Sequence, residues 1–218
     1  MIEDHQRQLL LEEYIEAHTD PEPETLAALA RRANLRLVSP RMMSGHLQGR
    51  LLKMFVRMQR PRKILELGTY SAYATACMAE ALPDGSSITT IEIFDELQPF
   101  ITDAIESLGF SDKVNPLIGN ALEILPTLPL EEFDMVYIDA NKRHYVEYIE
   151  MIEDRLPIGA VVIADNTLWD GKVIDEKEQD EQTVAIRKFN DRMMASKKFE
   201  KLILPIRDGL TIMYKISA

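Results

Sequence analysis

Cysteine is almost absent from this chain of 218 residues, because Cys77 is the only one. A single thiol excludes an internal disulfide framework and fits a reducing cytosol, so we expect a cytoplasmic protein. Cys77 lies within an alanine-rich helical pattern, and this setting predicts a small core residue rather than a nucleophile.

Long apolar runs are also missing. No segment approaches the ~20 apolar residues that a membrane-spanning helix needs, so we expect no membrane span. The opening residues MIEDHQRQ are charged and contain no apolar core of the kind that a secretion signal has. Hydrophobic residues make up 46% and charged residues 28% of the chain, which is an ordinary composition for a soluble globular protein.

Positive charge is scarce relative to negative charge. Lys and Arg number 25 against 36 Asp and Glu, which gives a formal net charge of -11. This balance disfavours broad binding to nucleic acid or to an anionic membrane, although a local basic patch remains compatible with it. The length suits one large α/β domain with a sizeable core.

Strand and helix patterns alternate from about residue 61 onward. Apolar strand patterns occur at 63–67, 87–93, 113–118, 136–138 and 161–164, and helical patterns at 71–82, 95–110, 121–128, 144–156 and 182–195. This alternation predicts an α/β fold with a doubly wound, mostly parallel sheet. Segment 202–216 reads as two strands around Asp208-Gly209, which predicts a C-terminal antiparallel hairpin and brings the sheet to seven strands.

The N-terminal residues show helical spacing without strands. Helices are expected over 1–19, from an N-cap at Thr25 onward, and over 43–58, with breaks at 20–24 and at Ser39-Pro40. We interpret residues 1–60 as a helical cap on an α/β core at 61–218, within a single domain that spans 1–218.

Polar side chains stand at the ends of two predicted strands. Asp139 follows the apolar residues 136–138, Lys142 comes three positions later, and Asp165 and Asn166 end the strand at 161–164. Ligands of open α/β sheets sit outside the carboxyl ends of the strands. Two carboxylates and an amide oxygen therefore predict a site for a hard cation such as magnesium, beside a lysine that supplies a movable base or a positive charge. Either aspartate alone could be a helix cap, but the set of four favours a functional site.

The first predicted strand ends in a second candidate site. Gly68 allows a tight turn and close approach of a ligand, and Glu92 closes the next strand, where an acid commonly accepts hydrogen bonds from ribose hydroxyls. The three-glycine fingerprint of dinucleotide sites is lacking, because Tyr70, Ser71 and Ala72 occupy the loop. A ligand without phosphates suits this loop better.

The motifs ELGTY, IEI, GNAL, IDANK, ADNTLWDG and RDGL follow one another in this order. With them, residues 40–218 resemble the cation-dependent O-methyltransferases, a family that includes catechol and caffeoyl-coenzyme A O-methyltransferases and their bacterial relatives. The resemblance implies a Rossmann-like class I methyltransferase fold, S-adenosylmethionine as cofactor, a divalent cation (magnesium or manganese) and a homodimer. It also implies that one of two adjacent hydroxyls of a small aromatic acceptor is methylated.

The resemblance also implies roles for individual residues. The metal ligands match Asp139, Asp165 and Asn166, the catalytic lysine matches Lys142, and the cofactor-binding positions match Met43, Ser44, Glu66, Gly68, Thr69, Tyr70, Ala74, Glu92, Ala121 and Asp139. Ala74 stands where relatives often carry serine, so one hydrogen bond to the cofactor carboxylate is expected to be missing. Trp169 lies in the segment that borders the acceptor pocket in the family, where a flat aromatic wall suits an aromatic substrate.

Three functions remain open at this point. The first is a catechol-type O-methyltransferase of small molecules, and the second is an O-methyltransferase of a hydroxylated tRNA wobble uridine. The third is a non-catalytic nucleotide-binding or interaction module, which the complete metal and lysine set disfavours. The net charge and the acidic run 175–181, which we expect to be a solvated mobile loop, count against tRNA.

Overall fold

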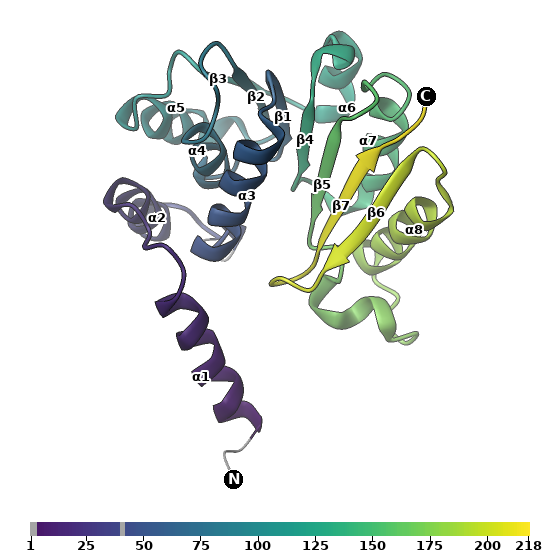
Figure 1. The fold of residues 1–218 in the computed structure, drawn as a ribbon, viewed down its shortest axis with the longest axis horizontal. Helices are drawn as coiled ribbons and strands as arrows, with labels where there is room; N and C mark the ends of the chain where they lie inside the picture. Colours follow the sequence, from purple (N-terminus) through teal and green to yellow (C-terminus); the bar gives the residue numbers. More distant parts are fainter. Residues whose placement is uncertain (1–3, 40–41) are drawn as a thin grey trace.

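The computed structural model describes residues 4–39 and 42–218, which form a sheet flanked by helices (Figure 1). The described α-helices are α1 (Asp4–Ala17), α2 (Glu24–Arg36), α3 (His46–Gln59), α4 (Tyr73–Ala79), α5 (Gln98–Ser107), α6 (Ala121–Ile124), α7 (Tyr145–Ile152) and α8 (Glu181–Ala195). The strands are β1 (Lys63–Leu67), β2 (Ser87–Glu92), β3 (Val114–Ile118), β4 (Met135–Ile138), β5 (Val161–Asp165), β6 (Phe199–Leu204) and β7 (Leu210–Lys215).

The sheet has seven strands in the order β3-β2-β1-β4-β5-β7-β6. The first five in this order run parallel, and β7 pairs antiparallel with both β5 and β6. The predicted fold class and the C-terminal hairpin are therefore confirmed. The chain winds outward from β1 in one direction and from β4 in the other, so the crevice between these two strands is where such folds bind ligands.

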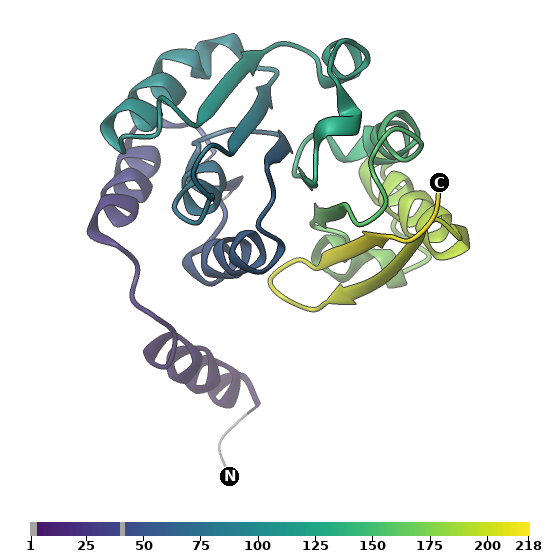
Figure 2. The same ribbon diagram turned by 45° about the horizontal axis from the view of Figure 1, so that its top comes forward.

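The central strands are covered by helices on both faces (Figure 2). Helices α2 to α5 pack with one face of the sheet, and α6 to α8 pack with the other. Within β1, Ile64 joins the first core and Leu65 and Leu67 join the second, which explains the nearly continuous apolar pattern of this strand. Glu66 is fully buried among these apolar residues, although an acidic side chain is rarely fully buried without a partner.

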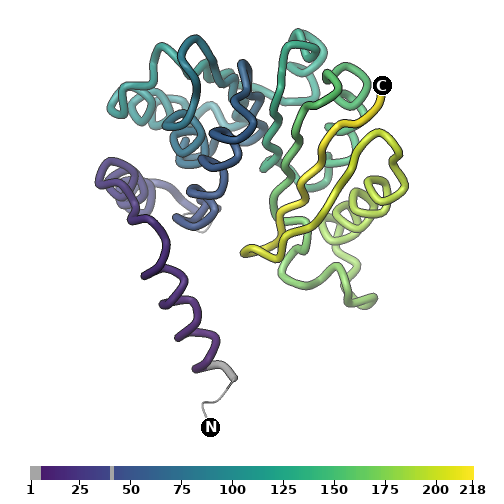
Figure 3. The backbone as a smooth tube through the Cα atoms, viewed as in Figure 1, coloured from purple at the N-terminus to yellow at the C-terminus, as the bar shows by residue number. Residues whose placement is uncertain are grey.

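The N-terminal helices differ in how they meet this core. Helices α2 and α3 pack against it through buried leucine and valine side chains, namely Leu26, Leu29, Leu52 and Val56. Helix α1 instead projects from the body of the molecule (Figures 1 and 3) and leaves its large apolar side chains exposed, namely Leu9, Leu10, Leu11, Tyr14 and Ile15. The division into a cap at 1–60 and a core at 61–218 stays a prediction.

Several predicted element boundaries need comment. The N-cap at Thr25 is wrong: α2 begins at Glu24 with Pro23 in the N-cap position, because the proline ring fixes φ near the value that a helix start needs. The predicted break at Ser39-Pro40 involves Pro40, and the first predicted helix involves residues 1–3, all of which lie outside the described residues. In the described part of the chain, no helix is long and apolar enough to cross a membrane.

Candidate active site

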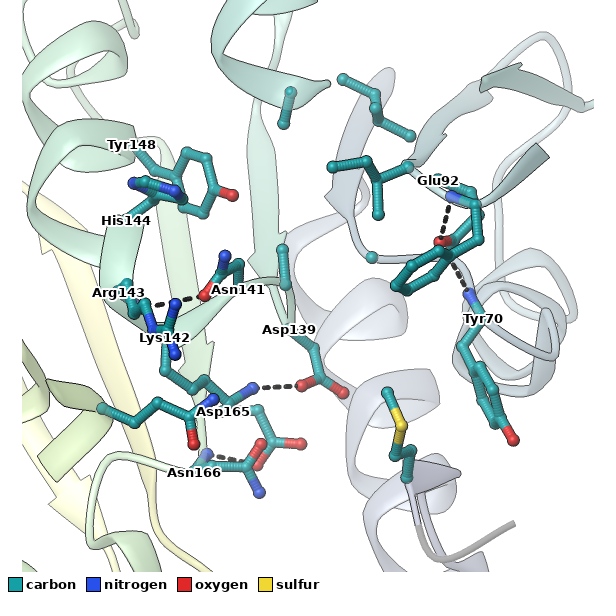
Figure 4. A pocket seen from close by; sticks show the side chains of 18 of the residues that line it. Tyr70, Glu92, Asp139, Asn141, Lys142, Arg143, His144, Tyr148, Asp165 and Asn166 are labelled. Atoms are coloured by element: carbon teal, nitrogen blue, oxygen red, sulfur yellow. Dashed lines mark hydrogen bonds and ion pairs between the residues drawn. The ribbon is translucent and has the colours of Figure 1, made fainter. Parts of the chain in front are cut away.

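A cavity of about 700 Å³ opens at the carboxyl ends of the parallel strands. Ten of the fourteen predicted site residues line it: Ser44, Gly68, Tyr70, Glu92, Ala121, Asp139, Lys142, Asp165, Asn166 and Trp169. In Figure 4, Tyr70 and Glu92 lie on one side of this cavity, Lys142, Asp165 and Asn166 lie on the other, and Asp139 lies between them. Residues from the two halves of the sheet therefore share one hollow, as the strand order requires.

The predicted cation site lies where β4 and β5 end. Lys142 Nζ donates a hydrogen bond to Asp139 Oδ1 at 2.7 Å, and both side chains border the same cavity as Asp165 and Asn166. Carboxylate and amide oxygens are the donors that magnesium and manganese prefer, so these residues fit a hard divalent cation. Among the described residues, no group of three or more His, Cys, Asp or Glu side chains is placed to hold a metal, so the third oxygen would come from Asn166.

Asp165 is held in place by buried hydrogen bonds. Its Oδ2 accepts from Gln48 Nε2 at 2.6 Å and from the Tyr137 hydroxyl at 3.1 Å, and its Oδ1 accepts from the Asn166 backbone N–H at 2.7 Å. Burial and the nearby Asp139 carboxylate raise the pKa of Asp165 to about 6, while the Gln48 hydrogen bond acts in the opposite direction. A cation between the two carboxylates would relieve this repulsion.

Tyr145 ties the two strand ends together. Its hydroxyl donates to the carbonyl oxygens of Ile138 at 3.2 Å and Asp165 at 2.9 Å. Burial and the neighbouring aspartates hold the pKa of Tyr145 well above its usual value of 10, so the hydroxyl stays protonated and can donate. Lys142 Nζ lies 5.1 Å from the centre of the Tyr145 ring, which is within the range of a cation–π contact.

The predicted cofactor half of the cavity is built on the turn after β1. Gly68 has φ +95, and a Cβ atom here would overlap the backbone carbonyl of Asp139, so only glycine fits. Glu92 accepts from the backbone N–H groups of Tyr70 at 2.7 Å and Phe94 at 3.0 Å, which fixes its carboxylate and leaves further lone pairs for a ligand. The Phe94 side chain is exposed beside it and borders the cavity, as a surface for a flat apolar ring would.

Four predicted site residues do not line the cavity: Met43, Glu66, Thr69 and Ala74. The Met43 carbonyl accepts from Arg207 Nη1 at 3.1 Å, the Thr69 hydroxyl pairs with that of Thr90, and Ala74 is buried within α4. These four residues therefore lie outside the cavity lining, and their predicted contact with a cofactor stays a prediction.

Glu66 is the most unusual of these four. Its Oε2 accepts from Thr75 Oγ1 at 2.5 Å, but its Oε1 is buried without a hydrogen-bond partner among the described residues. Burial raises the pKa of Glu66 to about 8, although the hydrogen bond from Thr75 acts in the opposite direction. A buried oxygen without a partner is uncommon in folded proteins, so Glu66 is unusual in both its charge state and its hydrogen bonding.

Residues with an unfavourable backbone conformation are concentrated around this cavity. Seven described residues other than glycine have positive φ, and four of them line the cavity: Tyr70, Asn166, Trp169 and Arg207. Such conformations cost of order 1–3 kcal/mol each for bulky residues and persist where the surroundings enforce them, which is common at ligand sites.

The segment after Trp169 is anchored rather than loose. The Arg187 guanidinium, on α8, donates to the carbonyl oxygens of Lys172, Val173, Asp175 and Glu178. The acidic run that follows ends as the start of α8, where Asp180 is the N-cap and accepts from Thr183 N at 3.0 Å. Negative charge at a helix N-terminus is favourable, so part of the expected mobile loop has a structural role instead.

Sequence reasoning missed several residues of the site. Gln48, Tyr137 and Tyr145 contact the strand ends, and Arg143 and Arg207 line the cavity. One signal was available for Gln48, because it precedes Leu52 and Val56 by four and eight positions and so lies on the buried stripe of α3. A polar side chain on such a stripe needs a partner, which here is Asp165.

The chain matches known proteins along most of its length. The family model described as O-methyltransferase matches residues 15–216. A catechol O-methyltransferase of Niastella koreensis is 34% identical over 160 residues, which cover 72% of this chain and 72% of that protein. Caffeoyl-CoA O-methyltransferase 1 of Arabidopsis thaliana is 28% identical over 181 residues, which cover 78% of this chain and 70% of that protein.

A solved structure shares the whole architecture. The O-methyltransferase TomG from Streptomyces achromogenes, involved in tomaymycin synthesis and crystallised in complex with SAM, superposes with a TM-score of 0.88 at 28% sequence identity. The superposition covers 100% of each chain.

Proposed function

The chain belongs to the O-methyltransferase family, and from this premise we propose that it is a divalent-cation-dependent enzyme that methylates one of two adjacent hydroxyls of a small aromatic acceptor. The methyl donor is S-adenosylmethionine, as the family and the SAM complex of its structural neighbour support. One observation carries the proposal. The oxygens of Asp139, Asp165 and Asn166 and the ammonium of Lys142 border the same cavity as Glu92.

On the donor side, the residues of this chain would bind and orient S-adenosylmethionine. Glu92 would accept hydrogen bonds from the ribose hydroxyls, and Phe94 and Ala121 would flank the adenine. When bound, S-adenosylmethionine supplies a methyl group on a positively charged sulfur, and the turn at Gly68 would hold its methionine part. The Asp139 carboxylate borders the same cavity and would place negative charge on the side of this cation.

On the acceptor side, the residues prepare an oxygen to attack. Asp139, Asp165 and Asn166 would hold a divalent cation, which would supply positive charge that makes a nearby hydroxyl more acidic. Lys142, which is 2.7 Å from Asp139, would take the proton of this hydroxyl as a neutral amine after it passes its own proton to solvent, or would stabilise the developing oxyanion as an ammonium group. Tyr145 keeps both strand ends in register, and in-line placement of the two reactants supplies much of the remaining rate.

Trp169 and the loop that follows would form a wall for the acceptor ring. Trp169 is held with φ 48 at the edge of the cavity, and Arg187 fixes the loop after it. A rigid aromatic wall favours a flat ring with its two neighbouring hydroxyls turned to the cation.

A tRNA substrate is the second candidate. Arg143 and Arg207 at the cavity are exposed cations that a phosphate could contact, and they are the observation in its favour. Arg143 is paired with Glu181, and the formal net charge is -11, so we favour the small acceptor.

One experiment separates these functions. The protein is incubated with S-adenosylmethionine and Mg²⁺ and either a panel of catechols or bulk tRNA, and products are identified by mass spectrometry. We expect monomethylated catechols, loss of product in excess EDTA and recovery when Mg²⁺ is restored. Full transfer with the metal content measured as nil would refute cation dependence, and methylated nucleosides without methylated catechols would select tRNA.

We also propose that the protein is a homodimer in the cytoplasm. The exposed apolar side chains of α1, with Leu10 and Tyr14 among them, form a surface that a second copy could cover. Light scattering coupled to size-exclusion chromatography should give about twice the mass of 24.9 kDa. Replacing both residues with serine should shift the mass toward one chain.

A further inference from the structure

We propose that Gln48 is a positioning residue for the cation site, which holds the Asp165 carboxylate in the orientation that binds the metal. The inference rests on the cation dependence proposed above and extends it to α3, an element outside the strands that carry the ligands. No property of the metal ligands themselves predicts a role for this helix.

The contacts form a closed set of three side chains. Gln48 Nε2 donates to Asp165 Oδ2 at 2.6 Å and to the Tyr137 hydroxyl at 2.9 Å, and that hydroxyl donates to the same Oδ2 at 3.1 Å. Oδ2 is thus held by two donors at once. The carboxylate cannot rotate about its χ2 angle without breaking both hydrogen bonds, so the remaining lone pairs keep a fixed direction.

Burial increases the importance of these hydrogen bonds for the orientation of Asp165. Gln48 is 1% exposed, Tyr137 is 0% exposed and Asp165 is 4% exposed, so water has little access to replace a lost donor. Asp139 and Asp165 border the same cavity, so their negative charges repel each other. Without Gln48, Oδ2 would keep only the longer hydrogen bond from Tyr137, and this repulsion would turn the carboxylate away from the cation position.

An amide suits this position better than a positively charged side chain. A lysine or arginine would hold the oxygen equally well, but its positive charge would repel a divalent cation nearby. A glutamine donates the hydrogen bond while it leaves the negative charge of Asp139 and Asp165 available to the metal. Hydrogen bonds that orient metal ligands in this way commonly change metal affinity by 10–100-fold when they are removed.

The same helix provides a matched control. Gln59 is the last residue of α3, and its Nε2 donates to the Gly159 carbonyl at 3.0 Å, at the other end of the helix from Gln48. The variants Gln48→Met and Gln59→Met each replace a hydrogen-bonded glutamine with an unbranched apolar side chain of similar size. A general effect of losing a glutamine contact on α3 should appear in both variants.

The test is a calorimetric titration of the full chain with Mn²⁺ alone, and separately with S-adenosylmethionine alone. We expect Gln48→Met to weaken Mn²⁺ binding at least tenfold and to leave S-adenosylmethionine binding within about twofold, while Gln59→Met changes neither. The electron paramagnetic resonance spectrum of bound Mn²⁺ should also change in Gln48→Met, because the direction of one ligand changes.

Unchanged or tighter Mn²⁺ binding by folded Gln48→Met would overturn the inference and leave the proposed function intact. If circular dichroism shows that this variant does not fold, Gln48→Asn replaces it, since it keeps a polar amide on α3 but withdraws the donor from Asp165 Oδ2. Unchanged Mn²⁺ affinity in Gln48→Asn would then overturn the inference. Failure of the unmodified chain to bind Mn²⁺ would overturn cation dependence itself, and the inference with it.

Discussion

The ammonium group of Lys142 is paired with Asp139 three residues before it, with 2.7 Å between Nζ and Oδ1. The lysine side chain is only 9% exposed, so this pair is largely shielded from solvent. Such a lysine is already in place before an acceptor arrives, and its partner is itself a predicted metal ligand.

Replacing Lys142 with alanine should lower turnover by about 10²–10⁴-fold, because its action is confined to the reacting oxygen. Affinities for S-adenosylmethionine and Mn²⁺ should fall little or not at all, since removal of a positive charge does not weaken a cation site. Single-turnover kinetics and calorimetry check the two halves of this expectation. The exposed Lys188 on α8 provides the control, and an unchanged rate in Lys142→Ala would make the lysine a bystander.

Replacing Glu92 with alanine should weaken S-adenosylmethionine binding at least tenfold. Hydrogen bonds to a charged group are worth roughly 1.5–3 kcal/mol each, and we propose that Glu92 accepts two from the ribose. The exposed Glu96→Ala, four residues further on, should bind normally in the same calorimetric titration. Equal affinity in folded Glu92→Ala would remove this residue from the cofactor site.

Cation binding should weaken as the pH falls through 6. A metal ligand must be deprotonated, and burial with the neighbouring Asp139 raises the pKa of Asp165 to about 6, so protons compete with the metal at this unusually high pH. The dissociation constant for Mn²⁺ should rise about tenfold per pH unit below 6. A constant affinity from pH 7 to pH 5, measured in buffers of equal ionic strength, would contradict the assignment.

Glu66 should make the ligand-free protein less stable as the pH rises. Its folded-state pKa of about 8 lies above the usual 4.5, so the folded protein holds a proton that the unfolded chain releases between these values. This contribution to stability is complete below pH 4.5 and is lost as the pH rises through 8. The variant Glu66→Gln cannot ionise. Between pH 5 and pH 9, its free energy of unfolding should therefore rise relative to that of the parent by on the order of 1 kcal/mol or more. Urea unfolding at both pH values, with EDTA present, measures the difference, and parallel curves would show that Glu66 is already ionised.

Arg187 should affect binding of the methyl acceptor but not binding of the cofactor. Arg187→Met removes donors to four loop carbonyls, so the segment after Trp169 should loosen and the KM for the acceptor should rise several-fold. Cofactor affinity should stay unchanged, because Glu92 and Gly68 lie on the other side of the cavity. Faster proteolytic cleavage between residues 170 and 180 is the independent readout, and an unchanged cleavage rate would show that other contacts hold the loop.

The sequence predicted those parts of the molecule that depend on local pattern. Short apolar strands that end in Asp139 and Asp165 determine where the polar groups meet, because parallel strands end on one edge of the sheet. The C-terminal hairpin could also be predicted from neighbouring residues, because Asp208 and Gly209 are typical residues of a hairpin turn.

The missed features depend on contacts between distant parts of the chain. Gln48 meets Asp165 across 117 positions, and nothing near either residue indicates the other. Tyr145 looks like an ordinary core aromatic until its hydroxyl is seen to join two strand ends. The acidic run 175–181 resembles a free loop in sequence, because the arginine that binds its backbone carbonyls, Arg187, lies on the following helix.

The turn at Gly68 has a consequence for anyone who wishes to alter the chemistry of this protein. The Gly68 backbone lies so close to the Asp139 carbonyl that the turn after β1 and the end of β4 would have to move together. A directed-evolution library should therefore leave this turn unchanged, because a larger side chain would displace the proposed cofactor and cation sites at the same time. Variation is better placed in residues 170–180 and around Arg207, where new acceptor shapes can be sampled while the spacing of the two proposed sites stays constant.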